Sequence, residues 1–181
     1  MTEYYLDLET YVEEKPDPTR DKIITIQYQR LSMDGRPEGE LTILTEKEYG
    51  SEKAILEAFK PTFLTDNKFD FIPVGVNLYG YDLICLIHRL NHHFDLGLGF
   101  DFLRDKPVID IKSTLVMMNR GRFEGYQRLL GKTTSGSVIR AWYEAGDWPR
   151  ILEYVREEAE LFTNKYRVLR QTLPQVFTKT G

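Results

Sequence analysis

Runs in the first quarter of the chain alternate between hydrophobic and polar residues with the period of two that is typical of β-strands. In the first such run, this period places Leu6 and Leu8 on one face and the acids Asp7 and Glu9 on the other. In the second run, the alternation sets Ile24, Ile26 and Tyr28 against Thr25, Gln27 and Gln29. Three strands joined as an antiparallel meander are therefore predicted, at residues 3–9, 23–31 and 41–44.

From residue 50 onward, the spacing of apolar residues lengthens to the period of amphipathic helices. Ser51 is placed to cap a first helix, Asp82 to begin a second, and Asp147 to begin a long last helix with Pro149 in its first turn. The buried stripe predicted for the last helix is Ile151, Val155, Ala159, Phe162 and Tyr166. The other predicted elements are strands within 69–76 and 108–110 and helical pieces at 114–118 and 126–130. This order predicts an α/β fold, a mixed β-sheet flanked by helices.

Length and cysteine content narrow the class of protein. A chain of 181 residues is one domain's worth, so we expect a single domain over residues 1–181 that buries a core without disulfides or a structural metal. The one cysteine, Cys85, excludes a disulfide framework and a multi-cysteine zinc site. No long apolar segment or signal peptide is evident, and we therefore expect a soluble, cytoplasmic protein.

Acidic residues stand at the ends of several apolar elements. Asp7 and Glu9 have Cα atoms about 6.6 Å apart on one side of a strand, so their carboxylates could contact one cation. Asp82 follows a buried strand and a glycine-containing turn that carries Asn77. A solvated edge strand, a favourable charge at a helix N-terminus and a turn-forming asparagine explain the same residues without a ligand.

The last predicted helix carries a third acidic site. Tyr154 and Glu158 are four residues apart, so they share one face beside the buried stripe. Glu157 lies on a different bearing, where we expect it to be solvated or paired. An ordinary charged helix surface is the alternative explanation.

Three segments together carry a resemblance to a known family: LDLET at residues 6–10, GVNLYGYD at 75–82 and YVREE at 154–158. They resemble the DEDD, or DnaQ-like, 3′-5′ exonuclease superfamily of the RNase H-like fold. The closest similarity is to the exonuclease domains of family B DNA polymerases and their stand-alone relatives. The tyrosine variant of the third family motif ends in aspartate, where this chain has Glu158.

The resemblance implies a role for each matching residue. The implied ligands of two Mg²⁺ or Mn²⁺ ions are the acids Asp7, Glu9, Asp82 and Glu158. Asp7 would bridge both ions, Glu9 and Glu158 would complete one site, and Asp82 would serve the other. Tyr154 would orient the attacking water, and Thr10 and Asn77 would lie against the terminal nucleotide. Two such ions neutralise charge during phosphodiester hydrolysis, and hard cations prefer oxygen ligands.

Charged residues are distributed unevenly along the chain, with one basic segment in an otherwise acidic sequence. Its net charge of −4 excludes a uniformly basic surface, yet six basic residues and one acidic residue lie from Lys112 to Arg140, a local charge of +5 that leaves −9 elsewhere. Such a segment suits contacts with phosphates, which we assign to Arg120 and Arg122. Solvated helix faces are an equally weighted alternative. Four aromatic residues could stack on bases, although aromatic residues at such spacing more often belong to a core: Tyr79, Tyr81, Phe123 and Tyr126.

These observations predict a hydrolase, namely a metal-dependent 3′-5′ exonuclease that acts on the 3′ end of DNA or RNA. One alternative is a non-catalytic exonuclease-like module that docks nucleic acid or a protein partner, and another is endonuclease action on the same scaffold. The sequence contains no dinucleotide-binding fingerprint for hydride transfer and no Walker loop for nucleoside triphosphate hydrolysis. The pair His88 and His92 has the spacing of a two-histidine zinc site, but no cysteine is near and we disfavour this interpretation.

Overall fold

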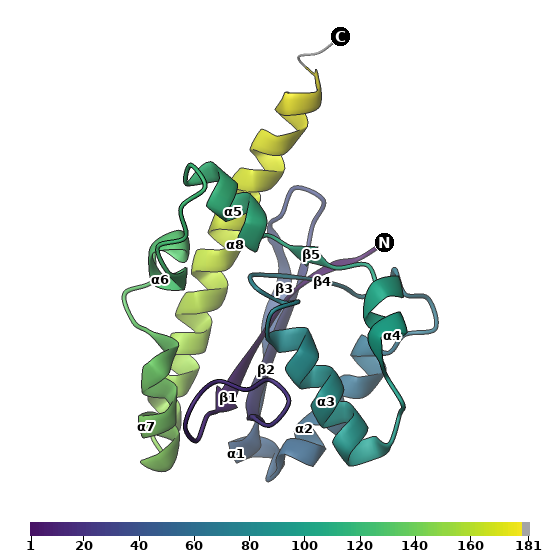
Figure 1. Ribbon diagram of the computed structural model, residues 1–181, viewed down its shortest axis with the longest axis vertical. Helices are drawn as coiled ribbons and strands as arrows, with labels where there is room; N and C mark the ends of the chain where they lie inside the picture. The colour runs from purple at the N-terminus through teal and green to yellow at the C-terminus, as the bar shows by residue number, and fades with distance from the viewer. Residues whose placement is uncertain (179–181) are drawn as a thin grey trace.

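A five-stranded mixed sheet runs through the centre of the protein. The computed structural model describes the backbone of residues 1–178 and the side chains of residues 1–173 (Figure 1). The strands are β1 (Glu3–Tyr11), β2 (Lys22–Leu31), β3 (Pro37–Thr45), β4 (Ile72–Gly75) and β5 (Ile109–Asp110), in the order β3-β2-β1-β4-β5. β1, β2 and β3 pair antiparallel, whereas β4 pairs parallel to both β1 and β5. The predicted meander and mixed sheet are thus confirmed.

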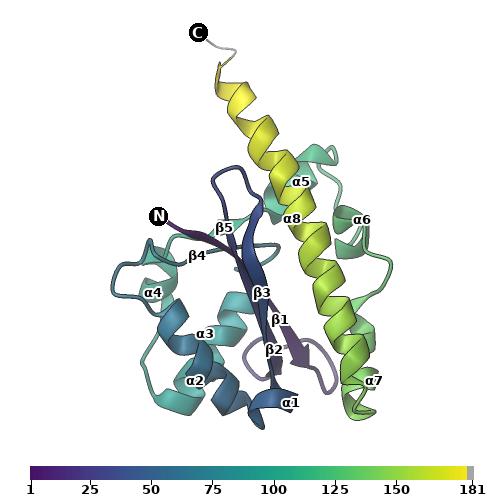
Figure 2. The same ribbon diagram turned by 180° about the vertical axis from the view of Figure 1, so that it is seen from behind.

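Helices cover both faces of this sheet. The helices are α1 (Glu46–Tyr49), α2 (Glu52–Phe63), α3 (Asp82–Phe94), α4 (Phe100–Asp105), α5 (Lys112–Met118), α6 (Tyr126–Leu130), α7 (Ile139–Glu144) and α8 (Trp148–Thr178), with a 3-10 turn at Gly136–Val138. Figures 1 and 2 show α2, α3 and α4 on one side of the sheet and α5 to α8 on the other. The short helices α1, α4 and α7 were not predicted.

The alternation along β1 is what separates the two layers. Leu6 and Leu8 are buried in a cluster with residues of α2 and α3, such as Phe59. Tyr5 points the other way, and its ring centroid lies 4.8 Å from that of Phe162 on α8. The acids of β1 therefore face α8, as the period of two predicts.

The helix α8 packs along the sheet by its predicted stripe. Ile151, Val155, Ala159, Phe162 and Tyr166 are all buried. Further along, the Tyr166 hydroxyl donates to Glu3 Oε2 at 2.7 Å and Arg170 pairs with Glu3 Oε1 at 3.0 Å, which fixes the helix against the start of β1. No helix among the described residues is both long enough and apolar enough to cross a membrane.

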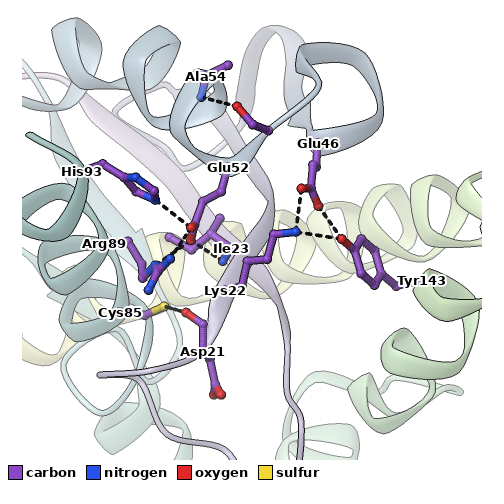
Figure 3. A network of polar contacts seen from close by, with 11 residues as sticks. Asp21, Lys22, Ile23, Glu46, Glu52, Ala54, Cys85, Arg89, His93 and Tyr143 are labelled. Atoms are coloured by element: carbon purple, nitrogen blue, oxygen red, sulfur yellow. Dashed lines mark hydrogen bonds and ion pairs between the residues drawn. The ribbon is translucent and has the colours of Figure 1, made fainter.

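Figure 3 shows a buried carboxylate that joins β2 to the helices α2 and α3. Glu52 accepts from the Ile23 amide at 2.7 Å and from Arg89 Nε at 2.8 Å, and its Oε2 lies 2.8 Å from His93 Nε2. Burial alone would raise the pKa of Glu52, but the hydrogen bonds from Arg89 and His93 outweigh it and hold that pKa below its usual value. Among the described residues no histidine joins a metal-binding cluster, so the structure offers no support for zinc at His88 and His92.

One predicted alternation is wrong at its first position. The β1–β2 register shifts where Glu9 pairs with Thr25 and Thr10 pairs with Ile23, which leaves Ile24 as the extra residue of a β-bulge. Ile24 therefore packs with Tyr154 and other residues of α7 and α8 rather than on the face of Ile26.

Candidate active site

Three carboxylates from distant parts of the chain meet between β1 and α8. Asp7 and Glu9 extend from β1, Glu158 extends from α8, and one ligand oxygen of each lies within 4.8 Å of the others. Glu158 reaches this point because it lies one helical turn beyond Tyr154, whereas the exposed Glu157 accepts a hydrogen bond from Thr133 at 3.1 Å. A donor set made only of carboxylate oxygens suits Mg²⁺ or Mn²⁺. The residues present thus fit such an ion.

Asp82 lies in the same cleft but outside this tight group. It is the first residue of α3, where the chain has just left β4 through a tight turn, and its side chain is buried. Burial and then the charge of Asp7 raise the pKa of Asp82 well above its usual value. The structure therefore brings the four predicted acids into one cleft, three of them as a close triad of Asp7, Glu9 and Glu158.

The carboxylates destabilise one another when charged. Burial raises the pKa of Asp7, and the pKa of Glu9 is raised further because burial is reinforced by the charges of Asp7 and Asp82. The positive charge of Lys132 opposes both shifts. Bringing a cation to this site removes an unfavourable interaction, which is a property expected of a metal centre.

Lys132 is a site residue that the sequence did not single out. It follows α6, and its ammonium forms an ion pair with Glu158 Oε1 and lies 5.7 Å from the centre of the Tyr154 ring. Both side chains of the pair are about nine-tenths buried. The sequence counts Lys132 only as one of six basic residues in a segment, and no local pattern links it to a residue 26 positions later.

Gln27 is a second site residue that the sequence did not single out, and it holds Asp7 by a hydrogen bond. Gln27, the cross-strand partner of Asp7, donates from Nε2 to Asp7 Oδ2 at 2.9 Å, and the Tyr5 hydroxyl donates to the same oxygen at 3.4 Å. The Oε1 of Gln27 accepts in turn from Thr25 at 2.9 Å, and both residues are fully buried. Gln27 and Thr25 lie opposite Asp7 and Glu9 on the neighbouring strand. This polar pairing could have indicated their role, but only if the register of the two strands had been known.

Tyr154 is held beside the carboxylates as a neutral phenol. It is buried against Trp142, with the ring centroids 6.2 Å apart. Burial, followed by the charges of Glu9 and Asp7, raises the pKa of Tyr154 far above its ordinary value. The hydroxyl therefore keeps its proton and can donate a hydrogen bond at neutral pH.

Asn77 and Thr10 line the same cleft, each in a hydrogen-bonded setting. Asn77 adopts a left-handed backbone conformation (φ 65°), and its backbone N–H donates to Asp110 Oδ1 at 2.8 Å. Its side-chain oxygen accepts from Lys112 Nζ at 2.7 Å. The Tyr81 hydroxyl donates to Asp21 at 2.5 Å, so at its 2.7 Å contact with Thr10 it is the Thr10 hydroxyl that donates.

The predicted phosphate contacts lie away from these groups. Arg120 and Arg122 are exposed on the loop between α5 and α6 and are not part of the cleft wall. Other members of the basic segment are paired, as with Arg128 and Glu124 at 2.8 Å. Within the described part of the chain, no carboxylate pairs with Arg120 or Arg122.

The four acids, Tyr154, Asn77 and Thr10 line one cleft of about 720 Å³. Its wall includes all three sequence segments and also part of the basic segment, among them Tyr126, Lys132 and Arg140. Acids outnumber basic residues in this wall, and its two basic side chains are already paired, Lys132 with Glu158 and Arg140 with Glu144, so the cleft is predominantly acidic.

Comparison with known proteins shows the fold. No protein-family model and no curated protein sequence matches this chain. A crystal structure of E. coli exonuclease I with a dT13 oligonucleotide aligns with 98% of this chain and 43% of its own, with a TM-score of 0.61 and 12% identity. The metal-free E. coli exonuclease I complex with single-stranded DNA aligns with 68% of this chain and 31% of its own, with a TM-score of 0.50 and 15% identity.

These similarities confirm the RNase H-like α/β fold, as found in exonuclease I. The chain spans less than half the length of those enzymes. They give no support to the expected closer kinship with polymerase exonuclease domains.

Proposed function

We propose that this protein is a metal-dependent 3′-5′ exonuclease that hydrolyses phosphodiester bonds of DNA or RNA by a two-metal-ion mechanism. The observation that carries the proposal is the convergence of Asp7, Glu9 and Glu158 within 4.8 Å in a cleft that also holds Asp82. Isolated surface acids have simple structural explanations, whereas acids gathered from β1, α3 and α8 into one cleft repel one another unless cations or protons neutralise them. The fold shared with exonuclease I supports the same conclusion.

Each residue of the site has a part in the proposed chemistry. Asp7, Glu9, Asp82 and Glu158 would hold the divalent ions, which when bound neutralise charge on the attacking and leaving oxygens. The Tyr154 hydroxyl, kept protonated by its surroundings, would hold the attacking water by a hydrogen bond. Thr10 and Asn77 would contact the terminal nucleotide from the cleft wall, and Arg120 and Arg122 would contact phosphates further out.

The finer assignment within the superfamily rests on the third segment. The tyrosine at position 154 supports the type found in family B polymerases, because it occupies the position that precedes the last metal ligand by one helical turn. We keep this kinship, and the action on a 3′ end, as part of the proposal.

A non-catalytic nucleic-acid or protein-docking module is the second candidate. The ion pair between Lys132 and Glu158 favours it, because a lysine ammonium already neutralises one of the ligands. Glutamate in place of the family aspartate at position 158 also adds a rotatable bond to the site. Crystals soaked in Mn²⁺ separate the candidates: two bound ions support the exonuclease, and a single ion or none supports the module.

The activity itself is tested with 5′-labelled single-stranded oligonucleotides in Mg²⁺, in Mn²⁺ and in EDTA. We expect a ladder of products shortened from the 3′ end in either metal and intact substrate in EDTA. Asp7→Asn should abolish the ladder, while Glu157→Gln, a matched acid on the exposed side of α8, should keep it. Cleavage of circular single strands would identify an endonuclease instead, and full activity in EDTA would overturn the proposal.

A further inference from the structure

Two aromatic rings stand at the rim of the cleft without a place in the core. Phe123 and Tyr126 meet edge to face, with centroids 5.1 Å apart. Phe123 is 51% exposed, Tyr126 lines the cleft, and neither belongs to a hydrophobic core cluster of the described residues. About half of the Phe123 surface is thus free to contact a ligand beside the cleft. These rings therefore act on the surface rather than in the packing.

Lys112 links this pair of rings to the turn between β4 and α3 that carries Asn77. Lys112 Nζ lies 5.5 Å from the centre of the Phe123 ring and 5.4 Å from that of Tyr126, within the range of cation–π attraction. The same ammonium donates to Asn77 Oδ1 at 2.7 Å. The rings are therefore placed at a set position relative to the turn that leads into Asp82.

The charge around the rings selects one class of partner. Arg120 and Arg122 are exposed directly before Phe123 on the loop between α5 and α6, in the segment of net charge +5. Phosphates supply sequence-independent affinity to such a segment, and bases stack on aromatic rings whatever their identity. Together with the continuity of the rings with the cleft, this favours a single-stranded nucleic acid over an apolar peptide.

We infer that Phe123 and Tyr126 form a stacking shelf for unpaired bases of a strand whose end lies at Asp7, Glu9, Asp82 and Glu158. The inference rests on the proposed nuclease function and adds a substrate class to it. Stacking needs bases with free faces, so single strands and single-stranded overhangs are the substrates, and the shelf carries no preference for sequence. Base-paired ends must separate before they reach the cleft.

The test is the binding of labelled oligonucleotides in EDTA, measured by fluorescence anisotropy, with a single abasic nucleotide moved along the strand. Phe123→Leu keeps an apolar side chain but removes the ring, Phe123→Trp keeps a ring, and Phe100→Leu alters a phenylalanine that is 76% exposed on α4, outside the cleft wall. We expect Phe123→Leu to weaken binding by roughly 5- to 150-fold, the range of one lost base stack. Phe123→Trp should stay within about threefold of wild type and Phe100→Leu should match it.

The abasic scan distinguishes stacking from general packing. In wild type, one or two abasic positions should weaken binding by a similar factor, and in Phe123→Leu the same positions should have no further effect. Equal responses of both proteins to every abasic position, or an unchanged affinity of Phe123→Leu, would overturn the shelf and leave a protein partner as the use of this surface. Wild-type protein that binds no oligonucleotide at all would overturn the proposed function together with the shelf. Matching melting temperatures of the variants confirm that each is folded.

Discussion

Replacing Asp7 by asparagine should stabilise the metal-free protein while removing its response to divalent ions. Two unit charges 4.8 Å apart, the upper limit of the separations in the triad, interact with about 3.5 kcal/mol at an effective dielectric of 20. Asp7 faces two such carboxylates, and the attraction of Lys132 offsets part of their repulsion. Asparagine keeps an oxygen that can accept from Gln27. We expect a net gain of roughly 1–2 kcal/mol in the free energy of unfolding, or about 2–8 °C in Tm for a chain of this size.

A bound divalent ion should reverse the order of the two melting temperatures, so that wild type melts above Asp7→Asn. An ion present at about 100 times its Kd adds about 2.7 kcal/mol to the wild-type protein, which corresponds to about 5–11 °C. Asp7→Asn lacks one of the proposed ligands and should gain far less. The assay is thermal unfolding of both proteins by circular dichroism in EDTA and in saturating Mn²⁺, with Glu157→Gln as the control that should follow wild type under both conditions.

The diagnostic result is that Asp7→Asn has the higher melting temperature in EDTA and wild type has the higher melting temperature in Mn²⁺. If Asp7→Asn melts below wild type in EDTA, repulsion among the acids is not the dominant energy at this site. If it shows the same Mn²⁺-dependent rise as wild type, Asp7 is not a metal ligand. Either outcome refutes the reasoning that links buried acids to a metal centre.

The raised pKa values of Asp7 and Glu9 also set a pH dependence: the folded protein binds more protons than the unfolded chain, so in EDTA its stability should rise as the pH falls from 8 towards 5, and Mn²⁺ should flatten this slope in a pH series of urea unfolding curves. In single-turnover cleavage, Glu158→Gln should nearly abolish hydrolysis, Glu158→Asp should keep or raise it in Mg²⁺, and Glu157→Gln should be close to neutral; an inactive Glu157→Gln with an active Glu158→Gln would show that the helix register is misassigned. Replacing Arg120 and Arg122 together by alanine should weaken binding of all sequences alike and flatten the salt dependence of log K by about 0.7 per lost phosphate contact on a single strand, and an unchanged slope in a salt titration would assign both arginines to a solvated surface. Burial lowers the pKa of Lys106 to about 8, so between pH 8 and 10.5 the unfolded chain binds more protons and stability should rise with pH, whereas Lys106→Met should be more stable at pH 7 by up to roughly 3 kcal/mol and lack that rise in denaturant titrations; a less stable variant would show that the contact from Lys106 Nζ to the Phe63 carbonyl at 3.0 Å matters more than the buried charge.

Features that depend on the local period of the chain could be predicted from the sequence. The period of two on β1 places Asp7 and Glu9 on the face opposite Leu6 and Leu8, because successive side chains of a strand point to opposite sides. The helical period likewise selects Glu158 over Glu157, since only a residue one turn from Tyr154 shares its face. Such relations are set by backbone geometry within one element and need no knowledge of its neighbours.

Features that depend on how elements meet were decided by the tertiary structure alone. The ion pair of Lys132 with Glu158 joins a loop to α8, and no period relates the two positions. The bulge at Ile24 arises from the pairing of β1 with β2, so the alternation of one strand could not reveal it. The position of Arg120 outside the cleft wall follows from the path of the loop between α5 and α6, which packing against α8 determines and composition does not.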